Sequence, residues 1–155
     1  MPPKQEELKS THTIRRACDF YMRTPKFCVL GAKSQYDYER NLEFACKTSV
    51  QGGKFLGNIK LKDLQFSNVT VAYDYWQVKY GVRAANYIAT CLSIVLNTAR
   101  RHEVLLSNPV SLIQRTKAKP RKIKWTTPQV KQFLDTAYSN WEWRSIGLIV
   151  HMAFH

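Results

Sequence analysis

The chain has 155 residues, of which 45% are apolar and 23% are charged, and its formal net charge is +13. A chain of this length can bury a sizeable core as one domain, or as one domain with the start of another. No apolar run approaches the ~20 residues of a membrane span, and the first residues lack the apolar stretch of a secretory signal, so we expect a soluble, cytoplasmic protein. An excess of Lys and Arg favours polyanions, which makes nucleic acid the leading candidate partner.

The first third of the chain predicts two helices after a disordered start at residues 1–12. The first helix covers residues 14–22 and is stopped by Pro25. Its apolar face is expected to consist of Ile14, Ala17, Cys18 and Tyr21. Ser34 has the side chain of an N-cap, so the second helix is expected to run from there to about Thr48. Its apolar stripe recurs at steps of four and three residues, at Tyr38, Leu42 and Ala45.

The middle of the chain predicts turns and then a third helix. Gly52-Gly53 marks a turn, and a short packed segment is expected at Leu56-Gly57-Asn58, Leu61 and Leu64. Ser67 can cap the third helix, and Gly81 stands where a helix usually ends. The residues that we expect on one face of this helix are Ala72, Tyr75, Trp76 and Lys79.

The longest predicted helix runs from Arg83 to about Glu103. It carries an apolar stripe over about 25–30 Å of helix. This stripe is formed by Ile88, Cys91, Leu92, Val95 and Ala99. Asn108-Pro109 marks the exit from the helical region, because a residue before proline disfavours the helical conformation. Together these elements predict an all-α bundle over residues 13–114.

A basic segment, residues 115–124, separates this bundle from the rest of the chain. It reads RTKAKPRKIK and holds six bases and no acid. Pro120 and the lack of an apolar period are typical of an extended linker. Alternate residues of an extended chain lie about 6–7 Å apart on one side, close to the phosphate repeat of one DNA strand. We call residues 115–124 the basic strap; a solvated tether without a ligand is the alternative interpretation.

Residues 125–155 predict two helices of a second domain. Thr126 and Gln129 fit a capping box at the start of the first helix. The apolar stripe of that helix is expected at Val130, Phe133, Leu134 and Ala137. The second helix starts near Trp143 and still presents an apolar face where the sequence stops, so we expect that part of this domain is missing.

No pattern of catalytic or cofactor-binding residues emerges, and no cofactor is expected. The cysteines form no Cys-x-x-Cys pair, which predicts reduced thiols at Cys18, Cys28, Cys46 and Cys91. His151 and His155 stand four residues apart, as in some zinc helices, but Met152 takes the place of the glutamate base and no third ligand is evident.

The aromatic residues allow two interpretations. They could stack on unpaired bases, as in proteins that bind single strands. Their helical spacing and the absence of interleaved bases favour core packing instead. The residues concerned are Tyr73, Tyr75, Trp76, Trp125, Trp141 and Trp143.

The order of these segments resembles the core-binding, SAM-like domain of phage-type tyrosine recombinases (integrases). Residues 86–109, NYIATCLSIVLNTARRHEVLLSNP, resemble its last helix, with Ala99, Asn108 and Pro109 in the expected places. SQYDYERNL resembles its opening helix, and GKFLGNIKLKDL resembles its connection to the middle helices. KIKWTTPQVKQFLDTA and RSIGLIVHMAFH resemble the linker and the first helices of the catalytic domain. The resemblance covers about residues 13–155.

This resemblance implies a clamp whose helical and catalytic domains cover opposite faces of double-stranded DNA, with the basic strap crossing between them. Recombinase protomers could self-associate on the DNA, in a bacterial or phage-infected cell. The catalytic residues would follow His155, so these residues are expected to be inactive alone. The expected DNA contacts of the strap are Lys117, Lys119, Arg121, Lys122 and Lys124. The helix candidates, for which an exposed side chain without a ligand is the alternative, are Lys33, Ser34, Arg83, Asn86, Arg100 and Arg101.

Two other functions also fit the composition. A freestanding all-α DNA-binding regulator or recombination adaptor without enzymatic activity would share this charge and fold class. Binding of an acidic membrane surface through the strap needs apolar anchors, and only Ile123 and Trp125 lie beside the charges, so this function ranks last.

Overall fold

The computed structural model describes residues 8–9, 11–119 and 124–154. They belong to two compact units, Met1–Ala118 (unit 1) and Lys119–His155 (unit 2). In the described part of the chain the regular structure is helical, with two isolated bridges, Thr13 to Lys60 and Ser49 to Phe55, and no strand. The predicted all-α fold class is therefore confirmed. No helix in these ranges has the length and apolarity needed to span a membrane.

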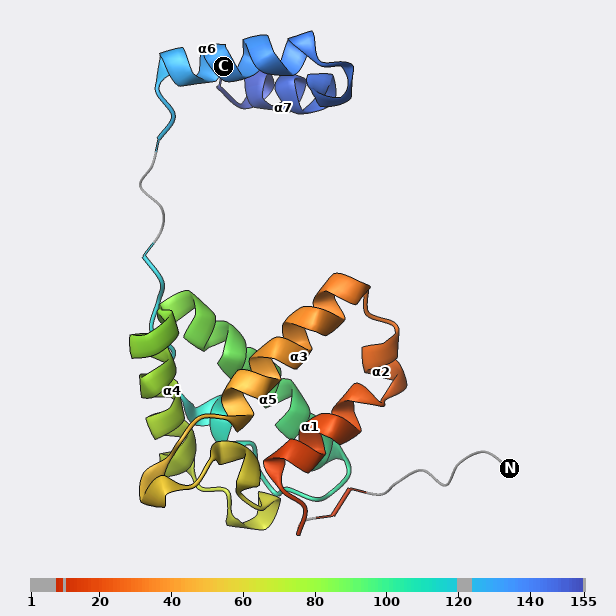
Figure 1. Ribbon diagram of the computed structural model, residues 1–155, viewed down its shortest axis with the longest axis vertical. Coiled ribbons are helices and arrows are strands. Elements are labelled where there is room, and N and C mark those ends of the chain that lie inside the picture. Colours follow the sequence, from red (N-terminus) through yellow and green to blue (C-terminus); the bar gives the residue numbers. More distant parts are fainter. Residues whose placement is uncertain (1–7, 10, 120–123, 155) are drawn as a thin grey trace, which may run out of the picture. The chain divides into compact units, whose positions relative to one another are not determined.

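Unit 1 is a bundle of α-helices connected by short 3₁₀ turns (Figure 1). The helices are α1 (Ile14–Met22), α2 (Pro25–Cys28), α3 (Ala32–Cys46), α4 (Phe66–Tyr80) and α5 (Val82–Arg101). The turns are η1 (Gln51–Gly53), η2 (Leu56–Asn58), η3 (Leu61–Asp63) and η4 (Pro109–Leu112). Helix α5 packs against α1, α3 and α4, so it is the central helix of the bundle.

The core of unit 1 follows the predicted apolar stripes. The whole stripe of α5 is buried, at Ile88, Cys91, Leu92, Val95 and Ala99. The predicted face of α1 is buried as well, at Ile14, Ala17, Cys18 and Tyr21. Each large apolar side chain removed from water stabilises the fold by about 1.5–3 kcal/mol before entropy costs. Leu8 also belongs to this core, contrary to the disorder expected there, while residues 1–7 and 10 lie outside the described ranges.

Two predicted helix starts are wrong by a few residues, whereas the predicted range 14–22 of the first helix is confirmed. Helix α3 follows Gly31, so Ser34 lies inside its first turn and is not its N-cap. Helix α4 begins at Phe66 and is capped by Gln65, which forms a reciprocal capping box with Asn68, so Ser67 is not the cap either. Each serine therefore indicated a nearby helix start correctly, but neither serine is the residue that caps the helix.

Pro25 has a second role that the sequence did not predict. Helix α1 ends at Met22, before the proline, and Pro25 occupies the first turn of α2. Proline is tolerated at that position, because the N–H that it lacks would have no partner inside the helix. Pro25 therefore opens a helix as well as following one.

The predicted face of α4 is only half correct. Its buried residues are Val69, Ala72, Tyr73 and Trp76. Tyr75 and Lys79 are exposed, and Lys79 Nζ donates to the Tyr75 hydroxyl at 2.7 Å. The charged end of a lysine is more stable in water than in a core. The buried face of α4 therefore includes Tyr73 and leaves Tyr75 and Lys79 in solvent.

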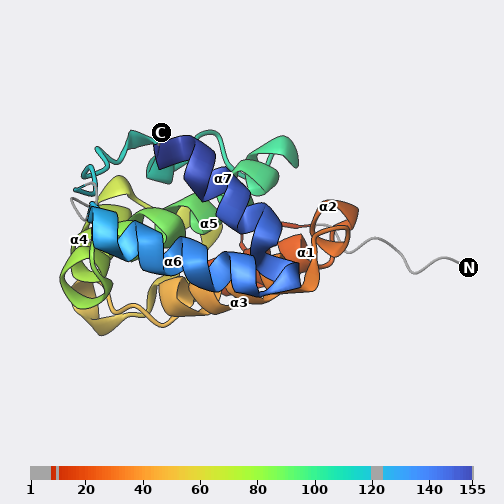
Figure 2. The same ribbon diagram turned by 90° about the horizontal axis from the view of Figure 1, so that it is seen from above.

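Unit 2 is a helical hairpin, visible in Figures 1 and 2, of α6 (Thr127–Ser139), η5 (Trp141–Trp143) and α7 (Arg144–Phe154). The predicted capping box is present, with the Thr126 amide donating to Gln129 Oε1 at 2.9 Å. The stripe of α6 lies toward α7, with Val130 and Ala137 buried and Phe133 and Leu134 half-buried.

The preference for core packing of the aromatic residues is confirmed for only two of the six. Tyr73 and Trp76 are buried in unit 1. The other four are exposed, so core packing is the wrong interpretation for Tyr75, Trp125, Trp141 and Trp143. Helical spacing defines a face, but it does not determine whether another element covers that face.

Candidate nucleic-acid interface

The start of α5 is set by a single residue, Gly81, which joins α4 directly to α5. Its φ of +82° lies in a region that other residues rarely adopt. Because the chain reverses in one residue, the first turn of α5 lies beside α4. Arg83 is exposed in that turn, and Asn86, one turn further, faces the buried Tyr73 of α4.

Three hydrogen bonds fasten the beginning of the basic strap to this corner. The Tyr73 hydroxyl donates to Asn86 Oδ1 at 2.6 Å, and Asn86 Nδ2 donates to the Thr116 carbonyl at 2.9 Å. The Thr116 amide donates back to the Tyr73 hydroxyl at 3.0 Å. We call this the Tyr73–Asn86–Thr116 network. Next to it, Arg115 Nη1 donates to Thr90 Oγ1 at 2.8 Å, so two strap residues are held against α4 and α5.

The sequence that follows Tyr73 and Asp74 is strongly basic. Between Asp74 and Asp135 the sequence holds eleven bases and a single acid, Glu103, so this stretch supplies ten of the thirteen net positive charges. Glu103 follows the far end of α5. The bases near the network are exposed, at Lys79, Arg83, Arg115 and Lys117. The hydrogen bond to the Tyr75 hydroxyl raises the pKa of Lys79, which keeps this side chain protonated.

The structure brings some of the predicted site residues together and separates others. Arg83 and Asn86 lie beside the start of the strap, whereas Arg100 and Arg101 are exposed in the last turn of α5, about 26 Å along the helix from Arg83. Lys33 and Ser34 are exposed in the first turn of α3. In Figure 1, α3 and α5 both begin at the upper edge of unit 1.

The strap residues divide into two groups. Lys117, Lys119 and Lys124 are exposed. Arg121 and Lys122 lie outside the described residues. The side-chain oxygen and nitrogen of Asn86 both form hydrogen bonds within the protein. Its observed role is to position the strap, and its contact with phosphate stays a prediction.

Comparison with known proteins gives one informative match. No family model matches the sequence, and no curated protein matches it. A crystal structure of a lambda integrase dimer bound to a COC' core site superposes with a TM-score of 0.64, over 83% of this chain and 35% of that chain, at 16% sequence identity. The chain has a tyrosine recombinase-like fold. It spans about a third of the length of the lambda integrase chain, and at this identity the likeness establishes the integrase-like fold alone.

The corner also contains residues that sequence reasoning missed. Lys79 and Arg115 were not among the predicted contacts, although the nearly acid-free stretch from residue 75 to 134 is a signal that could have found them. Tyr73 could not have been found in this way, because a tyrosine on a helix carries no sign that its hydroxyl will meet a residue 43 positions later.

The structure also bears on the possibility that His151 and His155 bind a metal ion. His155 lies outside the described residues, and His151 Nδ1 is 3.3 Å from the Tyr138 hydroxyl. Within the described ranges, no group of three or more His, Cys, Asp or Glu side chains could hold a metal ion.

Proposed function

We propose that this chain binds double-stranded DNA through the start of α5 and the basic strap, as the core-binding part of a site-specific tyrosine recombinase. The observation that carries the proposal is the Tyr73–Asn86–Thr116 network. It fixes the beginning of the most basic segment of the chain against the first turns of α5, the helix that carries Arg83.

The network favours binding because it reduces an entropy cost. Ordering the backbone of a flexible residue costs about 1–2 kcal/mol, and binding must supply that free energy. Two strap residues are already ordered by hydrogen bonds in the free protein, so their cost does not oppose binding. Bases that then neutralise phosphates release counterions, which makes the affinity depend steeply on salt.

The recombinase part of the proposal rests on two further observations. The fold is similar to that of lambda integrase, which was crystallised as a dimer on a core site, and the sequence segments occur in the order of that family. By this analogy, protomers of the present chain would also associate on DNA. We assign no strand-cleaving residue to the chain.

The test is a salt-dependent anisotropy titration of a labelled DNA duplex. With five or six phosphates neutralised, the affinity of the unmodified chain should fall by about three decades between about 50 and 200 mM salt. The double variant Lys117→Gln/Lys119→Gln should reduce the slope of log affinity against log salt by about 2.

The matched control is Lys54→Gln/Lys62→Gln. It removes the same charge from the turns around η1 to η3, which lie at the lower edge of unit 1 in Figure 1. Its slope should equal that of the unmodified chain. A flat salt response would contradict DNA binding, and an equal slope change in both double variants would contradict the role of the strap.

A further inference from the structure

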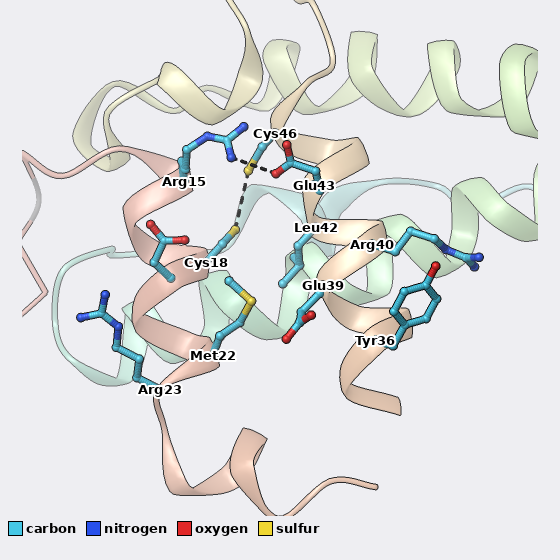
Figure 3. Close-up of a pocket in the computed structure, with 11 residues that line it drawn as sticks. Arg15, Cys18, Met22, Arg23, Tyr36, Glu39, Arg40, Leu42, Glu43 and Cys46 are labelled. Carbon is cyan, nitrogen blue, oxygen red and sulfur yellow. Dashed lines mark hydrogen bonds and ion pairs between the residues drawn. The ribbon is translucent and has the colours of Figure 1, made fainter. Parts of the chain in front are cut away.

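A groove between α1 and α3 contains a pair of cysteines that the proposed DNA interface does not use. It has a volume of about 640 Å³ (Figure 3). Its rim carries three bases and three acids, Arg15, Arg23, Arg40, Asp19, Glu39 and Glu43. Cys18 of α1 and Cys46 of α3 point toward one another between the two helices.

The two thiols are close enough to react with each other. Their sulfur atoms are 3.9 Å apart, although 28 residues separate them in the sequence. A disulfide has a sulfur–sulfur distance of about 2.05 Å, so the sulfurs need to approach by roughly 2 Å. Both residues line the groove, where each keeps 3% of its surface exposed, so a small molecule in the groove would lie next to them.

Cys46 packs closely against η2. A Cβ on Gly57 of η2 would be 2.8 Å from Cys46 Cβ and 2.9 Å from the Cys46 carbonyl oxygen. Helix α1 packs against η2 as well, so the approach of the two sulfurs falls mainly to the two cysteine side chains.

The pKa values of the two thiols are shifted in opposite directions. The hydrogen bond from Cys18, and then the Arg15 guanidinium, lower the pKa of Cys46. The same hydrogen bond, together with burial, raises the pKa of Cys18. Of the two thiols, Cys46 is therefore the one that loses its proton more readily. By contrast, burial raises the pKa of the Cys91 thiol to about 11, which leaves that thiol unreactive.

We propose that Cys18 and Cys46 form a redox modification site that closes to a disulfide when a peroxide enters the groove. The Cys46 thiolate attacks one oxygen of hydrogen peroxide, the O–O bond breaks, and Cys46 becomes a sulfenic acid; the second oxygen leaves as hydroxide and takes up the proton that the thiol had released, giving water. The Cys18 sulfur then attacks the Cys46 sulfur, forming the S–S bond and releasing the sulfenic oxygen as a second water. Two thiols and one peroxide therefore give one disulfide and two waters.

The disulfide would link α1 covalently to α3. The bond closes a loop of about 30 residues, which restricts the unfolded chain and should raise the melting temperature by about 5–10 °C. The modification would thus change the stability of unit 1 without using any residue of the proposed DNA interface.

The experiment is peroxide treatment of the full chain, followed by alkylation of the remaining thiols, trypsin digestion and mass spectrometry without reductant. We expect peptides 17–23 (ACDFYMR) and 41–47 (NLEFACK) to appear as one linked species that dithiothreitol separates, and the melting temperature to rise before reduction and fall after it. The variant Cys18→Ser should stop at the sulfenic acid, which dimedone labels in peptide 41–47.

The control variant is Cys28→Ser, which removes the exposed thiol of α2 and should leave the linked species unchanged. Both peptides recovered in alkylated form after treatment would overturn the proposal, and so would a link that involves Cys28. The peptide map of the unmodified chain decides this even if a cysteine variant fails to fold. None of these measurements uses DNA, so their outcome is independent of the proposed function.

Discussion

The Tyr73 hydroxyl donates to Asn86 Oδ1 at 2.6 Å and accepts the Thr116 amide at 3.0 Å, so one buried tyrosine links two helices to the start of the basic strap. These hydrogen bonds explain why Thr116 lies against α4 and α5 although no apolar pattern holds it there. Hydrogen bonds made to a buried group are costly to leave unmade, and this cost keeps the three groups together.

Tyr73→Phe removes the hydroxyl and leaves two partners unsatisfied, at Asn86 Oδ1 and the Thr116 amide. We expect the free energy of unfolding to fall by about 1–2 kcal/mol and the Thr116 amide to exchange with solvent faster. Urea denaturation and hydrogen exchange measure the two effects. Tyr75→Phe, in which the lost hydroxyl is exposed, should cost less than about 0.5 kcal/mol. Unchanged exchange at Thr116 in Tyr73→Phe would disprove the network.

Asn108→Ala should strongly destabilise unit 1. Asn108 is buried, and its Nδ2 lies within 3.1 Å of the Ser93 carbonyl, Ser93 Oγ and Asn97 Oδ1. Its Oδ1 accepts the Val110 amide at 3.0 Å and so caps η4. Losing these bonds should cost about 2–4 kcal/mol in urea denaturation, because buried groups on α5 and η4 lose their partners. Asn58→Ala, at an exposed position in η2, should change stability little, and an equal loss in both variants would argue against this role.

Gly57→Ala tests the close approach of η2 to α3. The added methyl group would lie 2.8–3.0 Å from three Cys46 atoms, two of them backbone, so the two segments must move apart. Overpacking of this kind costs about 1–3 kcal/mol, which a thermal or urea melt would detect. The control is Gly31→Ser, at a site with no atom within 4 Å, where a serine can cap α3 and should be neutral or stabilising. A neutral Gly57→Ala would show that the contact is not tight.

Glu43→Gln should reduce stability only above the acidic range. The Glu43 carboxylate accepts from Arg15 at 2.8 Å and from Lys47 at 3.1 Å, and these bonds lower its pKa. Its contribution is therefore present above the unfolded pKa of about 4.3 and is lost as the pH falls through the folded value. The side chains are partly exposed, so we expect under about 1 kcal/mol near pH 7, less in high salt, and no difference near pH 3. A loss that is equal at both pH values would refute the electrostatic explanation.

Much of the fold was predictable because it depends on local periodicity. The stripes of α1 and α5 identified their buried residues correctly, and the Thr126–Gln129 capping box was read from residue types three positions apart. Errors arose where two local signals compete. Ser34 and Ser67 have good capping side chains, yet Gly31 and Gln65 precede the helices, and Tyr75 was placed on a face that the neighbouring Tyr73 occupies instead.

By itself the sequence determined the helical class, the longest helix, the acid-free basic strap and the order of segments, because each depends on the spacing or sign of neighbouring residues. Only the tertiary structure decided which bases gather, since Arg115 is hydrogen-bonded to Thr90 in the N-terminal half of α5, the half that also carries Arg83, while Arg100 lies at the opposite end of that helix. It also decided the pairing of Cys18 with Cys46, which are 28 positions apart. The physical reason is that contacts between distant residues depend on how helices pack, and that packing is a property of the whole core.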